Sequence, residues 1–194
     1  MRNRPLLRMT LVAVAFAALA APVTIATSAS AHTMDDGNPT RAARNGPSAV
    51  LDLIRAAIAT APYHSLDLAN RAGYTTKVAD TAGITCIAEP GQGAMGVHFL
   101  SGVDNTVEAN KPELLVYEPD SAGRFNLVAL EYLVDQKTWD ATHSDVPSLF
   151  GQDFMLTGAG NRFGLDPFYS LHAWIWKINP SGLFSMWNPL VHCP

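Results

Sequence analysis

The sequence predicts an α+β fold in which an N-terminal helix, or a kinked pair of helices, packs on a curved antiparallel sheet. Two patterns carry this prediction. Apolar residues recur at helical spacing between residues 48 and 72, whereas beyond Gly83 short runs of β-branched and aromatic residues alternate with clusters of Gly, Pro, Asn and Asp. The order of the strands, and closure of the sheet into a partial barrel, are left open by the sequence.

The helical stretch starts at Ser48, a residue type suited to capping a helix N-terminus. Its recurring apolar positions are Val50, Ile54, Ile58 and Ala61. Pro62 predicts a kink or a split into helices at residues 48–60 and 63–72, because proline lacks the backbone donor that a helix interior needs. Gly73 follows where a helix C-cap is expected.

Extended runs make up most of the remaining chain. The predicted strands lie at residues 84–88, 95–100, 113–118, 125–134 and 168–178. Two long polar connections separate the later strands, at residues 135–148 and 151–166. Connections of this length are often either functional covers over a site or mobile segments.

The N-terminal residues predict export. Three arginines precede an apolar stretch that leads to Ala29-Ser30-Ala31, the pattern of a secretory signal peptide over residues 1–31. Polar residues 32–46 predict a flexible lead-in, and residues 47–194 a single globular domain. The expected location is outside the cell or in the cell envelope, without stable insertion into a membrane.

The net charge and the hydrophobic content of the chain bear on which kinds of partner it can bind. The chain is 48% hydrophobic and its formal net charge is −4, and loss of residues 1–31 would remove three arginines and no acidic residue. An acidic globular domain of this kind argues against nucleic acid and anionic membranes as partners. Its oligomeric state is not determined by these numbers.

Both cysteines, Cys86 and Cys193, lie in the part of the chain that is expected to be exported, which predicts one disulfide. Closing a loop of about 100 residues stabilises a domain by roughly 4–5 kcal/mol in the chain-entropy model. Two buried free thiols are the alternative.

Strand alternation places ionisable side chains in rows that are otherwise apolar. One such row is Phe125, Leu127, Ala129, Glu131 and Leu133, and another is Phe168, Ser170, His172, Trp174 and Trp176. The ionisable side chains in or beside buried rows are His98, Glu118, Glu131 and His172. A buried carboxylate without a partner costs several kcal/mol, so each glutamate must find a cation, take up a proton or bind a metal.

Two imidazoles and two carboxylates suit one divalent ion such as zinc, iron, manganese or copper. Their spacing along the chain forms no compact metal motif, and other readings stay open. Glu118 can point outward at a strand end, Glu131 can pair with Arg124 or Arg162, and each histidine can be purely structural. Trp174 and Trp176 are either core aromatics or a stacking surface for a ligand.

Several segments resemble a group of uncharacterised secreted bacterial proteins. They are MGVHF, PELLVYEP, LVALEYLV, SLFGQDF, LHAWIWKINPSGLFSMWNP and the near-terminal Cys193, and the resemblance runs from about residue 85 to residue 193. The pattern of the group falls on His98, Glu118, Glu131 and His172, but it implies no reaction, cofactor or partner. This chain departs from the group at Phe99, where tyrosine is common, and at His192, where serine is commoner.

Three functions are compatible with these features. The first is an exported metal-binding protein whose metal activates water or polarises an oxygen, with one glutamate free as general base if it is an enzyme. The second is a non-catalytic module that binds a small molecule or an envelope ligand in a groove of Trp174, Trp176, Trp187 and the 151–166 loop. The third is a structural or interaction domain. Substrate and metal identity are not determined.

Overall fold

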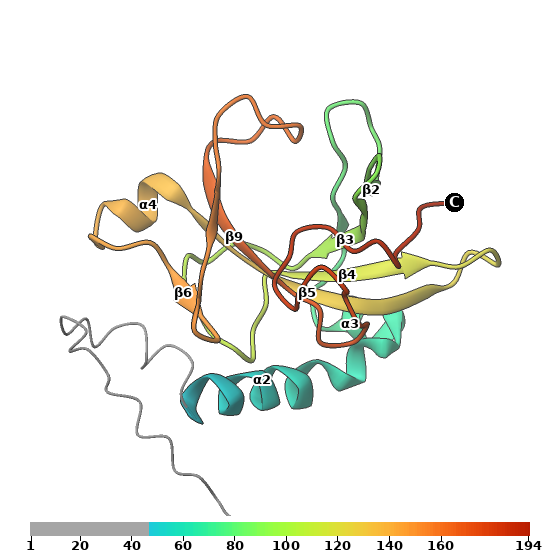
Figure 1. Ribbon diagram of the computed structural model, residues 1–194, viewed down its shortest axis with the longest axis horizontal. Helices are drawn as coiled ribbons and strands as arrows, with labels where there is room; N and C mark the ends of the chain where they lie inside the picture. The colour runs from blue at the N-terminus through green and yellow to red at the C-terminus, as the bar shows by residue number, and fades with distance from the viewer. Residues whose placement is uncertain (1–46) are drawn as a thin grey trace, which may run out of the picture. The chain divides into compact units, whose positions relative to one another are not determined.

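The computed structural model describes residues 47–194 (Figure 1). The signal peptide and lead-in predicted at residues 1–31 and 32–46 lie outside the described residues. The first described elements are α2 (Pro47–Thr60), the 3-10 helix η1 (Ala61–His64) and α3 (Leu66–Arg71). Pro62 splits the helical stretch as predicted, and Gly73 follows α3 with a φ of 103°, a conformation that favours glycine.

A seven-stranded antiparallel sheet forms the body of the domain, with strand order β1-β3-β4-β5-β9-β8 and with β2 also paired to β3. Its strands are β1 (Thr76–Lys77), β2 (Cys86–Glu89), β3 (Gly93–Leu100), β4 (Leu114–Pro119), β5 (Phe125–Asp135), β8 (Met155–Thr157) and β9 (Phe168–Ala173). The α+β prediction is confirmed, and the sheet does not close into a barrel. Within residues 47–194, no helix combines the length and the apolar character needed to cross a bilayer.

Every predicted strand region contains an observed strand, but the short elements were not predicted. These are β1, β8, the separate pair β6 (Ser148–Leu149) and β7 (Gln152–Asp153), and helix α4 (Gln136–Asp140). Each spans only one turn or two to three paired residues, which is too short to produce a periodic pattern in the sequence.

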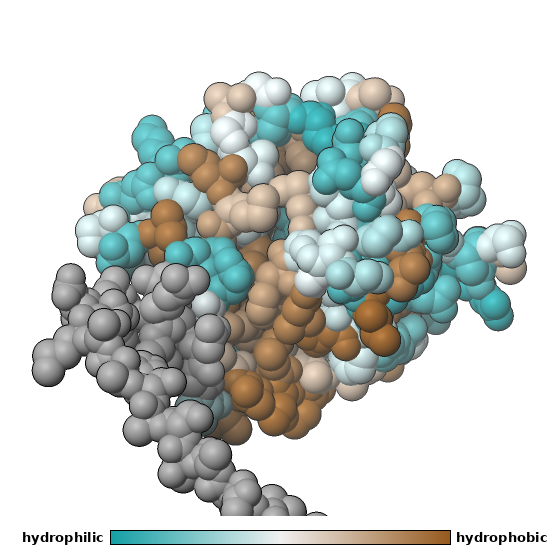
Figure 2. All heavy atoms as spheres, viewed as in Figure 1, coloured by the Kyte–Doolittle hydropathy of each residue, from teal (hydrophilic) through white to brown (hydrophobic). Residues whose placement is uncertain are grey.

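Helix α2 packs on one face of the sheet. The side of the helix that is buried there is not the one that its apolar spacing indicated. Ala56 is fully buried in the core cluster beneath the helix, together with Leu115 and Leu130 of the sheet. By contrast, Ile54 and Ile58 are 48% and 71% exposed. Small side chains allow the helix to approach the sheet closely, so the larger apolar residues form an exposed patch over α2 (Figure 2).

A β-bulge at Val128 changes the faces of β5. Two neighbouring residues of β4 pair with Ala129 and Leu127, which leaves Val128 between them without a partner. Leu127 therefore belongs to the core beneath α2, while Ala129 packs with the cluster on the opposite face. The predicted single row from residue 125 to residue 133 is wrong in its first half, because the extra residue breaks the alternation.

The C-terminal segment returns across the sheet face that is turned away from α2. Cys193 forms the predicted disulfide with Cys86 of β2. Asn188 exchanges two backbone hydrogen bonds with Ala94 of β3, each 3.1 Å long. Val191 packs on the same face in a small apolar cluster with Ala94. The disulfide and this bridge hold the segment in place over the site described below.

Candidate metal centre

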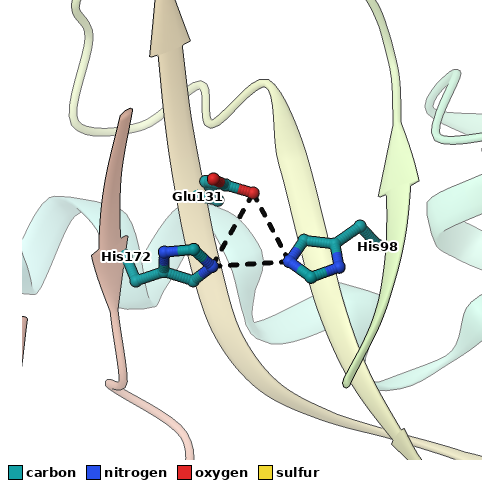
Figure 3. A group of neighbouring side chains, drawn as sticks. All are labelled: His98, Glu131 and His172. Atoms are coloured by element: carbon teal, nitrogen blue, oxygen red, sulfur yellow. Dashed lines mark hydrogen bonds and ion pairs between the residues drawn. The ribbon is translucent and has the colours of Figure 1, made fainter. Parts of the chain in front are cut away.

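Three predicted ligands meet on the sheet face opposite α2, namely His98 from β3, Glu131 from β5 and His172 from β9 (Figure 3). Glu131 and His172 are direct partners in the register of β5 and β9. His98 approaches them across β4, where its own register partner is Val116. The antiparallel pairing of β3, β4, β5 and β9 thus brings together residues that are far apart in the sequence.

The donor atoms of the three side chains form a nearly equilateral triangle. Nε2 of His98 lies 3.4 Å from Nε2 of His172. Oε2 of Glu131 lies 3.5 Å from the first of these nitrogens and 3.7 Å from the second. Three atoms that bind one ion at about 2.1 Å with tetrahedral angles lie about 3.4 Å apart, whereas adjacent ligands of an octahedral ion lie about 3.0 Å apart. The triangle therefore matches tetrahedral coordination better.

Burial controls the protonation of the group. His98, Glu131 and His172 are 3%, 7% and 4% exposed. Burial lowers the pKa of each histidine to about 4, and for His98 the Glu131 carboxylate opposes the shift while His172 adds to it. Burial raises the pKa of Glu131, whereas His98 and a hydrogen bond from the Ser170 hydroxyl favour its ionised form. Both rings are neutral at neutral pH, as metal binding requires.

The surroundings of the group hold the rings in place. The indole of Trp174 stacks near His172, with ring centroids 6.2 Å apart and planes 15° apart. Trp174 is in turn fixed by a 2.6 Å hydrogen bond from its Nε1 to the Ser185 carbonyl. Nδ1 of His98 is buried and makes no hydrogen bond of ordinary geometry, although the Gly96 backbone slightly favours the protonated ring.

Glu118, the fourth predicted ligand, does not reach the group. Leu114 of β4 is the register partner of Glu131, and Glu118 lies four residues beyond Leu114 on the same strand. Four strand residues span about 13 Å, so Glu118 is about that far from Glu131 along the strand direction. Its carboxylate binds Nζ of Lys177 at 2.5 Å and accepts a 3.0 Å hydrogen bond from the backbone of His192. Lys177 can approach because β9 ends at Ala173 and strand alternation no longer governs the residues beyond it.

Trp174 and Trp176 do not lie on the single face that strand alternation predicted for them, and of the two readings left open, a common stacking surface is not formed. Trp174 is 2% exposed and packs in the small apolar cluster on the sheet face that carries the candidate ligands. Trp176 packs against the core beneath α2 and donates from Nε1 to the Thr60 hydroxyl at 3.2 Å. The end of β9 at Ala173 separates them, because the chain bends there and the second tryptophan turns to the other side of the sheet.

A cavity of about 390 Å³ contains all three candidate ligands in its lining. The 151–166 loop contributes to its wall, as does Trp187 from the C-terminal segment. Sequence reasoning did not identify Leu100 and Leu114, which line the floor from β3 and β4. Their positions, two residues from His98 and in register with Glu131, are the signal that could have found them.

No family model matches the chain, and neither the curated proteins nor the solved structures contain a match to it.

Proposed function

We propose that this protein is an exported metal-binding domain that holds one Zn²⁺ ion with His98, Glu131 and His172. The observation that carries the proposal is the triangle of donor atoms, with sides of 3.4, 3.5 and 3.7 Å. Imidazole nitrogen and carboxylate oxygen are the donors that zinc accepts, and the spacing suits bonds of about 2.1 Å.

The burial of Glu131 supports the same conclusion. In the described part of the chain, its ion-pair partners are the two histidines, and burial keeps both of these neutral. A buried carboxylate without a cation costs several kcal/mol. A divalent ion supplies that cation, because the two rings and the carboxylate then become its ligands.

Three protein ligands leave a fourth coordination position open, as in catalytic rather than structural zinc sites. A bound zinc ion lowers the pKa of coordinated water and polarises a coordinated oxygen. Glu131 is the one carboxylate among the described residues that line the cavity, and Glu118 is engaged with Lys177. The arrangement therefore favours binding and polarising a coordinated molecule over a reaction that needs a separate carboxylate base.

Export and family are part of this proposal. The signal-peptide pattern of residues 1–31 and the Cys86–Cys193 disulfide both suit an oxidising compartment. The resemblance to the group of secreted bacterial proteins adds support, since three of its pattern positions are the three proposed ligands.

Metal analysis of untagged protein tests the proposal. After incubation with Zn²⁺ and desalting, the wild type should retain about one zinc per chain, and Glu131→Gln and His98→Ala should each retain almost none. Glu118→Gln and His143→Ala are matched controls, because they remove a glutamate and a histidine outside the group. Zinc content that is far below one per chain, and equal in wild type and both ligand variants, would overturn the proposal.

A further inference from the structure

We infer that the cavity over the metal centre binds a small apolar monocarboxylate, whose carboxylate takes the open coordination position. This inference rests on the proposed function, because the metal supplies the anchor. Its independent basis is the chemistry of the cavity wall.

The wall beside the candidate ligands is almost wholly apolar. The side chains that carry this point are Leu100, Leu114, Leu133, Phe163, Met186 and Trp187. The first three come from adjacent strands of the sheet floor, and Leu114 is the register partner of both Leu100 and Glu131. A ligand that reaches the metal must therefore place a carbon body against this floor, because polar groups there would lose their hydrogen bonds to water.

The one cationic side chain in the described lining is already paired with a carboxylate. Arg162 is that side chain; its Nη2 binds Asp80 at 3.0 Å, which neutralises its charge, while its buried Nε makes no hydrogen bond within the described protein. The amide of Asn161 is also engaged, since it donates to the carbonyls of Gly158 and Leu165 at 2.8 Å each. A ligand with charges at both ends would leave one of them unpaired, so its polar group lies at one end only.

Charge balance favours an anionic head. A divalent ion with one carboxylate and two neutral imidazoles leaves one net positive charge in a buried, apolar site. An uncompensated buried charge is costly, and a monoanionic oxygen donor neutralises it while filling the open position. A cationic or neutral head provides no such compensation.

The volume of the cavity indicates the size of ligand that it can enclose. Its volume of about 390 Å³ is on the order of thirteen water volumes, which accommodates a molecule of roughly ten to thirteen non-hydrogen atoms. Octanoate has this size and a single carboxylate. Acetate has the same head without the apolar body, and octylamine and 1-octanol have the same body with a different head.

Titration of the zinc-loaded wild type with these four compounds, followed by calorimetry, tests the inference. Octanoate should bind at least tenfold more tightly than acetate, octylamine or 1-octanol, and at least tenfold more tightly to the zinc-loaded protein than to chelator-treated protein. Octanoate affinity no greater than that of acetate or 1-octanol would overturn the inference. Zinc content measured on the same samples separates this failure from failure of the metal site itself.

A matched pair of leucines provides a second test. Leu165 lines the cavity, Leu156 does not, and each is 51% exposed. Leu165→Glu places a negative charge beside the ligand and should weaken octanoate binding at least tenfold, with zinc content unchanged. Leu156→Glu should leave both unchanged. Equal affinities in the two variants would show that octanoate binds outside this cavity.

Discussion

Nε2 of His98 and Nε2 of His172 lie 3.4 Å apart, although 74 residues separate them in the chain. Two neutral imidazoles can meet at this distance only if one nitrogen donates a proton or if both bind a third atom between them. Because Oε2 of Glu131 completes a triangle with the same two nitrogens, a shared metal ion accounts for all three contacts. The predictions below distinguish a metal centre from a buried group of polar side chains that only hydrogen-bond to one another.

Zinc should stabilise the wild type against heat. A ligand at one hundred times its Kd stabilises a protein by about 2.7 kcal/mol, which corresponds to a rise in Tm of about 5–10 °C in a domain of this size. His98→Ala should abolish this rise, and His143→Ala, which changes an exposed histidine stacked on Trp139, should preserve it. Scanning calorimetry with zinc and with chelator measures both. An equal rise in the two variants would contradict the assigned ligand.

Glu131→Gln should raise the stability of the metal-free protein and remove the stabilisation that zinc provides. Burial raises the pKa of Glu131, so its ionised form destabilises the folded state above the ordinary range of that pKa. In metal-free protein at pH 8, the amide should therefore increase the free energy of unfolding by about 1–3 kcal/mol. With zinc present, the variant should gain nothing from the metal.

Glu118→Gln is the control for this experiment. It removes the carboxylate that binds Lys177 and His192, so it should lower stability by about 1 kcal/mol with or without zinc. Urea unfolding of both variants at one pH gives the comparison. A metal-free Glu131→Gln protein that is less stable than the wild type would indicate a structural role for this carboxylate.

Glu113 should make stability fall as the pH rises. Burial raises the pKa of this carboxyl to about 7, although its Oε2 accepts a 3.0 Å hydrogen bond from the Leu133 backbone. Between about pH 4.5 and 7 the folded state binds more protons at this residue than the unfolded state does, so its contribution to stability is lost over that interval.

The Glu113→Gln variant isolates this effect. Its amide oxygen can accept the same bond but does not titrate, so the wild type should lose about 2–3 kcal/mol relative to the variant between pH 4.5 and pH 8. Urea unfolding at both values measures the difference. Parallel stability curves for the two proteins would show that Glu113 ionises normally in the folded state.

Gly96 should be intolerant of any side chain. Its φ is 108°, and a Cβ there would lie 2.5 Å from the carbonyl oxygen of Tyr117. Gly96→Ala should therefore cost about 3 kcal/mol or more and displace His98, two residues along β3. Gly91, with a φ of 81° and no atom near its added Cβ, is the control, and Gly91→Ala should cost only about 1 kcal/mol. Urea unfolding of both variants checks the difference.

Several features were predictable because they depend on neighbouring residues. Pro62 splits the helix because proline has no backbone N–H to donate. Gly73 follows the end of α3 because glycine readily adopts a positive φ. The strand regions follow from local composition. The even cysteine count in a chain that is expected to be exported predicted the bond between Cys86 and Cys193, which the structure contains.

Other features depend on contacts that no local pattern reports. The bulge at Val128 reverses the faces of half of β5, and the end of β9 at Ala173 separates Trp174 from Trp176. The buried side of α2 is the one with Ala56 rather than the one with Ile58, because close approach to the sheet requires small side chains. Each of these outcomes is a choice between two local arrangements of similar energy, and packing decides it.

For the candidate centre, the sequence by itself determined that His98, Glu131 and His172 lie within extended runs, and it predicted that they fall in or beside buried rows, since alternation is a property of the extended backbone. Only the tertiary structure decided which strands are neighbours, and in which register. That pairing makes Glu131 the register partner of His172 and places His98 on the far side of β4 from them. Glu118 lies away from the group and binds Lys177. Register is set by how whole faces pack together, so it is absent from any single strand.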